Sequence, residues 1–223
     1  MPAAEKLITM SDQRAPAAEA YRTLRTNLMF SSLERPLRTL LVTAPAPEEA
    51  AATGKSLALA NLAVTMAQGG RQTLLVDCDL RRPQLHDFFG LPREPGLTNL
   101  ILEADGNAEP ALAQTGVPNL SFLPAGPLPP NPADLLTSRR MEAVIASLQA
   151  RADLVLFDAP PVLAATDAAL LASKVDGVLL VIQAGRTRRE HALRARELLE
   201  KINVRLVGAV LADAAPDTGL RAY

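Results

Sequence analysis

Five short runs of apolar residues are spread along the chain, and within them apolar and polar positions do not alternate. They cover Thr39–Thr43, Thr73–Val76, Leu154–Phe157, Gly177–Ile182 and Leu206–Leu211, and each is rich in Val, Leu or Ile. Unbroken apolar runs of this length are typical of strands that are buried on both faces of a parallel sheet. The pattern therefore predicts five buried strands.

Segments with helical periodicity separate these strands. Ser56–Gln68 places Leu59, Leu62, Ala63 and Met66 on one stripe, and Gly69-Gly70 ends it. Further helices are predicted at Ser138–Ala150, at Thr166–Ser173 with Thr166 as N-cap, and at Thr187–Ile202. Because strands that alternate with helices indicate βαβ units, we expect an α/β fold with a doubly wound, mostly parallel sheet and helices on both faces.

A helix is also predicted before the first strand, over residues 16–31. It would place Ala20, Leu24 and Leu28 on one face. Residues 90–132 are rich in Pro and Gly and predict an irregular crossover, with a short helix near Leu97–Leu102 and a strand near Leu120–Leu123. Since no repeat or low-complexity linker divides the chain, we expect a single domain over residues 1–223.

Composition narrows the class of protein. The chain has 223 residues, of which 48% are apolar and 21% charged, and its formal net charge is −1. The apolar content excludes a disordered chain, and the balanced charge argues against nucleic acid as a partner. No apolar run approaches the roughly 20 residues of a membrane-spanning helix, and no signal peptide follows Met1. Cys78 is the only cysteine, which fits a reducing cytosol, so we expect a cytoplasmic protein.

A candidate phosphate-binding loop follows the first predicted strand. Gly54-Lys55-Ser56 stands between that strand and the next helix. In a P-loop, backbone N–H groups and the helix N-terminus hold phosphates, the lysine reaches the β and γ oxygens, and the serine hydroxyl contacts Mg²⁺. The loop departs from the usual pattern, because Glu49 stands where the first glycine is expected. A surface loop that happens to precede Gly-Lys-Ser is the alternative.

Carboxylates end two further predicted strands. Asp77 and Asp79 follow the second strand, and Asp158 follows the run that begins at Leu154. Carboxyl ends of parallel strands meet at one edge of a sheet, where doubly wound folds bind their ligands. Carboxylates there suit Mg²⁺ coordination and the acceptance of a hydroxyl proton, and solvated strand ends are the alternative for each one alone. Together with Lys55 and Ser56 they predict a site for phosphoryl transfer.

Six stretches of the chain, taken together, resemble the cytoplasmic catalytic domain of the bacterial tyrosine kinases of capsule and exopolysaccharide synthesis. They are Glu19–Arg25, Leu74–Pro83, Asn119–Gly126, Pro129–Leu136, Leu156–Pro161 and Asp176–Val181. The resemblance implies a P-loop NTPase-like fold and an ATP-dependent protein-tyrosine autokinase with ATP and Mg²⁺ as cofactors. It divides the chain into an N-terminal helical assembly segment (1–35) and a nucleotide-binding core (36–223).

The resemblance also implies residue roles. Gly54, Lys55, Ser56 and Leu57 would bind the nucleotide, and Ser56, Asp77 and Asp158 would hold the metal. Lys55, Asp77, Asp79 and Asp158 would be catalytic, with Asp79 helping to accept the tyrosine proton. Glu19, Arg22 and Arg25 would join subunits in a homo-oligomeric ring, and Tyr223 would be the phosphate acceptor.

The family further implies a transmembrane activator of the polysaccharide co-polymerase type. It would recruit this chain to the inner face of the cell membrane, so that contact with the membrane is made only through the partner. Three features depart from the family pattern: the four-residue insertion Ala50–Thr53, a C-terminal segment without a tyrosine cluster, and Ala212 where relatives place Asn near the nucleotide base.

Two alternative functions remain open on the sequence. The insertion Ala50–Thr53 motivates a degenerate, weakly catalytic or non-catalytic P-loop adaptor of the same membrane complex. A partition-type ATPase switch on a similar fold is a more distant alternative, because such proteins carry an extra lysine early in the loop and no lysine lies between Lys6 and Lys55.

Overall fold

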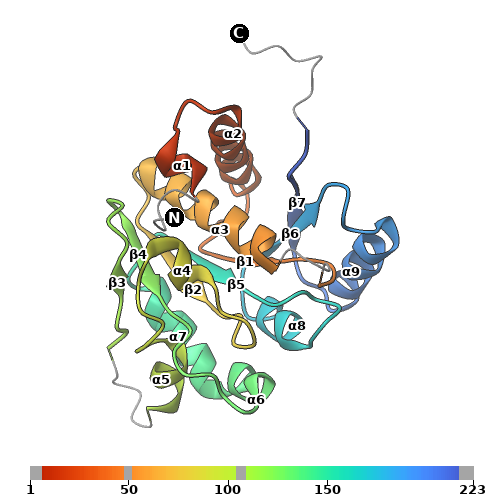
Figure 1. Ribbon diagram of the computed structural model, residues 1–223. Coiled ribbons are helices and arrows are strands. Elements are labelled where there is room, and N and C mark those ends of the chain that lie inside the picture. The colour runs from red at the N-terminus through yellow and green to blue at the C-terminus, as the bar shows by residue number, and fades with distance from the viewer. Residues whose placement is uncertain (1–6, 48–51, 104–108, 216–223) are drawn as a thin grey trace.

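The computed structural model describes residues 7–47, 52–103 and 109–215, and within them the strands form one mixed sheet. The strands are β1 (Thr39–Thr43), β2 (Thr73–Asp77), β3 (Ala113–Gln114), β4 (Leu120–Leu123), β5 (Leu154–Asp158), β6 (Gly177–Gln183) and β7 (Leu206–Ala212). Their order across the sheet is β3-β4-β2-β5-β1-β6-β7 (Figure 1). All neighbours are parallel except β3, which runs antiparallel to β4.

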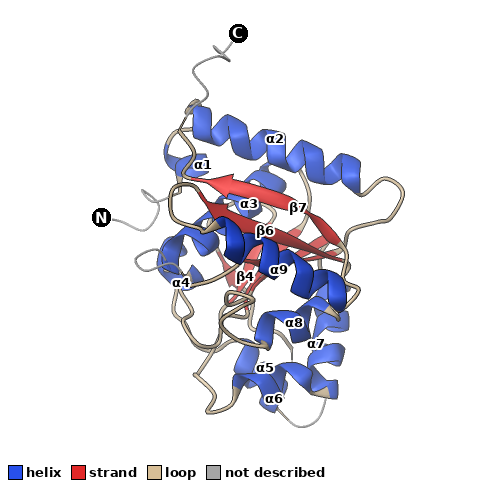
Figure 2. Cartoon of the chain, turned by 90° about the vertical axis from the view of Figure 1, so that its right-hand side faces the viewer, coloured by secondary structure: helices blue, strands red, loops and turns tan. Residues whose placement is uncertain are grey.

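Helices cover both faces of this sheet, which confirms the predicted fold class (Figures 1 and 2). One face packs against α1 (Ile8–Ser11), α2 (Pro16–Ser31), α3 (Ala52–Gln68) and α4 (Leu85–Phe89). The other packs against α5 (Leu97–Leu102), α6 (Pro132–Thr137), α7 (Arg139–Gln149), α8 (Asp167–Ala172) and α9 (Arg189–Lys201). None of the helices in the described residues has both the length and the apolar character needed to cross a bilayer.

The central strands are buried because successive side chains enter two different hydrophobic cores. On β1, Leu40 and Val42 pack on the α3 side, whereas Leu41 packs on the α8 side. On β5, Leu156 and Phe157 divide in the same way. A strand that faces a core on each side needs apolar residues at every position, which is why apolar and polar residues do not alternate in the sequence of these strands.

The predicted strands are confirmed with small shifts at their ends. β1 and β4 have the predicted bounds, and the other predicted strands each extend one residue further. The extra residues of β2 and β5 are Asp77 and Asp158, so these carboxylates belong to the strands. β3 was not predicted, because it is only two residues long and lies in the Pro- and Gly-rich crossover.

The α2 helix has the predicted bounds, but its buried face differs from the prediction. Ala18 and Leu28 are buried and Leu24 is half-buried, whereas Ala20 is exposed. The helix turns Ala18 inward because α2 packs on α3 along the face that also carries Arg25, whose Nη1 donates to the carbonyl of Thr65 at 3.0 Å. The prediction for Ala20 was therefore wrong.

The starts of α3 and α9 differ from prediction, and so does the predicted cap of α8. α3 begins at Ala52 rather than Ser56, so Gly54-Lys55-Ser56 lies within its first turns. Thr166 precedes α8 as predicted but makes no capping hydrogen bond, because its φ of −72° and ψ of −15° are helical, whereas a capping residue is usually extended. α9 begins at Arg189, since the Thr187 hydroxyl instead accepts from the backbone N–H of Gln183 at 2.9 Å.

Candidate functional site

Three neighbouring strands bring the candidate site residues to one edge of the sheet. β2, β5 and β1 are adjacent, and Asp77 is in register with Asp158. The chain leaves β1 at Thr43 and enters α3, whose first turns carry Lys55 and Ser56. The carboxyl ends of these strands therefore face the start of α3, as the position of a ligand site in a doubly wound sheet requires.

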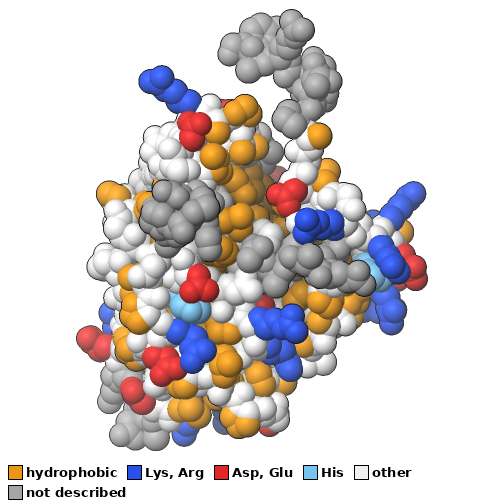
Figure 3. All heavy atoms as spheres, viewed as in Figure 1, with side chains coloured by type: hydrophobic (Ala, Val, Ile, Leu, Met, Phe, Trp, Pro, Cys, Tyr) orange, Lys and Arg blue, Asp and Glu red, His pale blue; other side chains and the backbone are white. Residues whose placement is uncertain are grey.

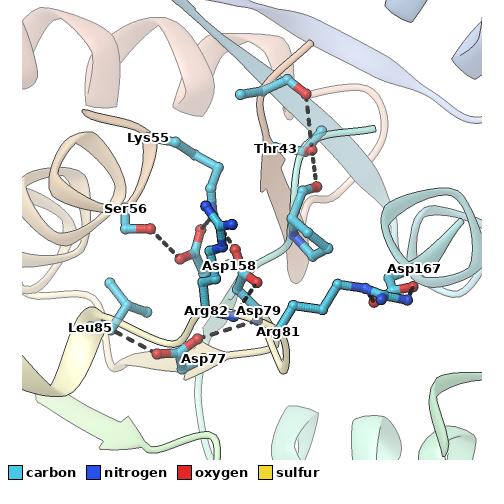
Figure 4. Close-up of polar contacts among 12 residues, drawn as sticks. Thr43, Lys55, Ser56, Asp77, Asp79, Arg81, Arg82, Leu85, Asp158 and Asp167 are labelled. Carbon is cyan, nitrogen blue, oxygen red and sulfur yellow. Dashed lines mark hydrogen bonds and ion pairs between the residues drawn. The ribbon is translucent and has the colours of Figure 1, made fainter. Parts of the chain in front are cut away.

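Lys55 and Ser56 both contact Asp158 (Figure 4). Lys55 Nζ donates to Asp158 Oδ1, and Ser56 Oγ donates to Asp158 Oδ2 at 2.6 Å. Lys55 Nζ also lies 3.7 Å from Asp79 Oδ2. All of these side chains are nearly or fully buried, so the contacts hold the lysine and serine against the end of β5.

The turn that follows β2 is organised by its own carboxylates. Asp77 Oδ1 accepts the backbone N–H of Asp79 at 3.2 Å, and Asp77 Oδ2 accepts that of Leu85 at 3.1 Å. Asp79 Oδ1 accepts the backbone N–H of Arg82 at 3.1 Å. Of the three carboxylates, Asp77 and Asp158 are fully buried and Asp79 retains some exposure, which leaves Asp79 as the one that reaches the adjoining cavity.

One lysine faces three carboxylates in this cluster, so negative charge is in excess. The pKa of Asp77 is raised to about 8, because burial and, to a smaller extent, the charge of Asp158 raise it while Lys55 opposes the rise. Burial likewise raises the pKa of Asp158, and again Lys55 opposes it. The apo site is therefore short of positive charge, which a bound cation would supply.

This charge imbalance gives a testable pH dependence. Asp77 has a pKa of about 8 in the folded chain, above its ordinary value, so its contribution to stability is present at low pH and is lost as the pH rises toward 8. Each pH unit over which the folded chain holds one proton more than the unfolded chain lowers the free energy of unfolding by about 1.4 kcal/mol. We therefore expect the unfolding temperature, measured without nucleotide or Mg²⁺, to fall between pH 5 and pH 8 by roughly 10 °C, the shift that about 4 kcal/mol produces in a chain of this length.

Asp77→Asn should flatten that fall, as measured by thermal denaturation across the same pH range. The asparagine accepts one hydrogen bond fewer than the carboxylate, so its unfolding temperature at any single pH is expected to be lower, and the slope with pH is the decisive quantity. An equal slope in both proteins would contradict the assignment of the proton to Asp77.

A cavity of about 240 Å³ adjoins the cluster. Lys55 and Asp79 form its polar wall together with two arginines, and apolar residues form much of the rest. It is lined by Ala44, Ala46, Pro47, Gly54, Lys55, Asp79, Arg81, Arg82, Pro160, Pro161, Ala164, Val181, Gln183 and Thr187. Lys and Arg side chains also gather near the neighbouring α9 (Figure 3). Arg186 and Arg188 are exposed on the segment before α9, and the exposed Arg189 is its first residue. This positive charge favours an anionic ligand.

The donor set fits Mg²⁺ bound together with a phosphate ligand. No group of three or more His, Cys, Asp or Glu side chains in the described residues has the arrangement of a complete metal site. Mg²⁺ is usually held by one or two carboxylates, water and substrate phosphates rather than by a cage of protein ligands. Ser56, Asp77 and Asp158 offer one hydroxyl and two carboxylates of this kind, and the unbalanced negative charge is consistent with a cation there.

The other predicted residues are placed less closely around this cluster. Gly54 lines the cavity, and Leu57 is half-buried against the core on the α3 side. On α2, Arg22 forms an ion pair with Glu19 at 2.6 Å, while Arg25 is directed toward α3. Tyr223 and the first two residues of the predicted insertion, Ala50 and Ala51, lie outside the described residues, and its last two residues begin α3.

Sequence reasoning missed two polar residues near the cavity. Asp167 is fully buried and accepts two hydrogen bonds from Arg81, at 2.8 and 2.9 Å. Gln183, at the end of β6, lies beside Gly54 and donates to Asp213 at 2.7 Å. A polar residue that ends an otherwise apolar strand was the available signal for Gln183, and it is the same signal that identified Asp158.

Ala212 lies at the end of β7 and is half-buried against the α3-side core. It is not among the residues that line the cavity, and Gln183 from the neighbouring strand reaches the cavity instead.

Comparisons with known proteins extend over nearly the whole chain, although no protein-family model matches. Tyrosine-protein kinase YwqD of Bacillus subtilis is 40% identical over 205 residues, which are 92% of this chain and 84% of that protein. The crystal structure of the chimerical protein CapA2B2 has a TM-score of 0.86 at 34% identity, over 93% of this chain and 89% of that chain. The kinase domain of Escherichia coli tyrosine kinase ETK has a TM-score of 0.86 at 30% identity, over 97% of this chain and 83% of that chain.

Proposed function

The chain belongs to the bacterial tyrosine-protein kinases, and from that membership we propose that it transfers the γ-phosphoryl group of ATP to a tyrosine hydroxyl on another copy of itself. The observation that carries this proposal is the cluster in which Lys55 and Ser56 meet Asp158 beside Asp77 and Asp79. It combines a phosphate-binding cation, a hydroxyl and carboxylates at one sheet edge, as phosphoryl transfer requires.

We assign each residue a role in the transfer. Gly54, Lys55, Ser56 and Leu57 would bind the nucleotide, with Lys55 contacting the β and γ phosphate oxygens. Ser56, Asp77 and Asp158 would hold Mg²⁺. When bound, the metal supplies positive charge that neutralises the charge developing on the phosphate oxygens. Lys55 would therefore exchange its contact with Asp158 for a phosphate contact when ATP enters.

Asp79 is the carboxylate placed to accept the proton. It is the least buried of the three and lines the cavity next to Lys55. In the transfer, the tyrosine oxygen forms a bond to the γ-phosphorus, the bond between that phosphorus and the oxygen of ADP breaks, and the tyrosine proton passes to Asp79. The apolar cavity walls at Pro160, Pro161 and Val181 provide space suited to an aromatic ring.

We further propose that the kinase assembles into a homo-oligomeric ring and acts together with a membrane partner. Glu19, Arg22 and Arg25 on α2 would join copies in a homo-oligomeric ring, with Arg25 also packing on α3 within its own chain. A transmembrane partner of the polysaccharide co-polymerase type would activate the kinase at the inner face of the membrane. The activity would regulate capsular or exopolysaccharide synthesis.

The test uses the fact that the chain contains only Tyr21 and Tyr223. With ATP, Mg²⁺ and the cytoplasmic fragment of the activator, we expect phosphotyrosine on immunoblots of the wild type and loss of the signal in Tyr223→Phe. Tyr21→Phe is the matched control and should retain the signal, because Tyr21 is partly buried on α2 and burial raises its pKa to about 12. Absence of phosphotyrosine in a folded wild type would contradict the proposed function.

A further inference from the structure

Arg81 and Asp167 form a two-point ion pair that joins the turn after β2 to the start of α8 (Figure 4). Arg81 Nε and Nη2 donate to the two carboxylate oxygens of Asp167 at 2.8 and 2.9 Å. The Asp167 side chain is fully buried, whereas that of Arg81 is 47% exposed. Paired N–H groups on one carboxylate fix orientation as well as distance, which a single contact does not.

The two partners come from segments far apart in the chain. Arg81 belongs to the turn after β2, two residues beyond Asp79 and next to Arg82, and all three line the cavity. Asp167 is the first residue of α8, on the opposite side of that cavity from α3. The near end of the turn, directly after β2, is fixed by the backbone N–H of Cys78, which donates to the carbonyl of Asp158 at 2.9 Å. The far end of the turn is held by the bonds from the backbone N–H groups of Arg82 and Leu85 to Asp79 and Asp77, and the ion pair in addition ties it to α8.

We propose that Arg81 and Asp167 are positioning residues that hold Asp79 and the neighbouring Asp77 in the geometry needed for Mg²⁺-nucleotide binding and transfer. This inference rests on the proposed function. In this role Arg81 acts through the turn, since Asp167 engages its Nε and Nη2, although the side chain also lines the cavity. Arg82, by contrast, has no side-chain hydrogen bond or ion pair to any described residue, so its guanidinium is free to face an anion.

A contribution to stability can be separated from positioning because Asp167 is buried, although Arg81 is half-exposed. Removing Arg81 alone leaves the charge of a buried carboxylate uncompensated, whereas replacing both partners by apolar residues removes that charge as well. A double apolar replacement therefore separates the two explanations. It should restore the stability that a single replacement loses, but it cannot restore the orientation of the turn.

The experiment compares Arg81→Met, Arg81→Met/Asp167→Leu and Arg81→Lys with the wild type. Thermal denaturation gives stability, and calorimetric titration with ADP gives the dissociation constant with and without Mg²⁺. We expect Arg81→Met to be strongly destabilised and the double variant to regain an unfolding temperature near that of the wild type. We define the Mg²⁺ effect as the ratio of the ADP dissociation constants measured without and with Mg²⁺. In the double variant this ratio should be at least tenfold smaller than in the wild type, and tyrosine phosphorylation should be lower by a similar factor.

Arg81→Lys covers the case in which the apolar variants do not fold. It keeps a cation beside Asp167 but not the two-point contact, so it should stay folded and lose part of the Mg²⁺ effect. The matched control is Arg196→Met, which removes an exposed i, i+4 ion pair with Glu200 on α9 and should change neither quantity.

Three results would overturn the positioning role. The first is recovery of the Mg²⁺ effect together with stability in the double variant, and the second is a wild-type Mg²⁺ effect in Arg81→Lys. The third is a wild type that binds ADP without any help from Mg²⁺. A wild type with a normal Mg²⁺ effect but no phosphotyrosine would instead contradict the proposed function, and the ADP titrations would still decide the role of the pair.

Discussion

Lys55→Met is expected to reduce tyrosine phosphorylation by about 10²–10³-fold or more, the loss typical when one preorganised charge-stabilising group is removed from a transition state. Lys55 is the only cation held within contact distance of the carboxylates of Asp158 and Asp79 in the described structure, and it lines the cavity. A methionine keeps the length of the side chain but cannot contact phosphate oxygens. Quantitative phosphotyrosine detection at saturating ATP measures the effect.

Lys55→Met should also destabilise the chain, and this distinguishes it from an ordinary surface substitution. It leaves Asp77, Asp79 and Asp158 buried together without a cation. Removing one partner of a buried ion pair costs about 3–5 kcal/mol in typical proteins. The loss of stability should be larger at pH 8 than at pH 5. Without Lys55 the pKa of Asp77 and of Asp158 rises further, so both carboxyls are protonated and neutral at pH 5, whereas at pH 8 more of their negative charge remains uncompensated.

Lys174→Met is the matched control for Lys55→Met. Lys174 is mostly buried and pairs with the exposed Glu142 away from the cavity, so its replacement should leave activity unchanged and should cost much less stability than Lys55→Met, because Glu142 remains solvated. Phosphotyrosine at wild-type levels in a folded Lys55→Met protein would contradict the placement of the nucleotide beside α3.

The strands were predictable because burial on both faces leaves a direct mark on the sequence, namely an unbroken apolar run. The order of the strands was not. Asp77 and Asp158 stand side by side because β5 inserts between β2 and β1, and nothing in the order of the chain states that insertion. Carboxylates at strand ends were therefore predictable as a set, and their contacts with Lys55 and Ser56 were not.

The start of α3 and the Arg81–Asp167 pair illustrate two other limits. The alanines before Gly54 were interpreted as a loop insertion, yet alanine is the strongest helix former, and α3 begins at Ala52. Arg81 and Asp167 are 86 positions apart, and their pairing depends on how α8 packs against the sheet. Long-range ion pairs of this kind carry no local sequence signal, which explains why Asp167 was missed.

Asp158→Asn is expected to abolish activity as fully as Lys55→Met does, but with little loss of stability in the absence of ligand. Charge is the reason: the cluster of Lys55 with three aspartates has a formal charge of −2, which becomes −3 in Lys55→Met and −1 in Asp158→Asn. Asparagine also keeps an oxygen for Lys55 and a polar amide for Ser56. The apo cluster is thus closer to balance without this carboxylate than without the lysine.

The activity of Asp158→Asn should nevertheless be lost, because the proposed Mg²⁺ site loses a charged ligand. ADP titrations should show binding that Mg²⁺ no longer strengthens, and phosphotyrosine should fall by about 10²-fold or more, on the scale of losing one charge-stabilising group. Thermal denaturation at pH 8 should place its unfolding temperature well above that of Lys55→Met. If the two variants were equally destabilised, the ion pair itself and not the excess of carboxylates would govern the stability of the site, and the inferred need for a bound cation would lose its support.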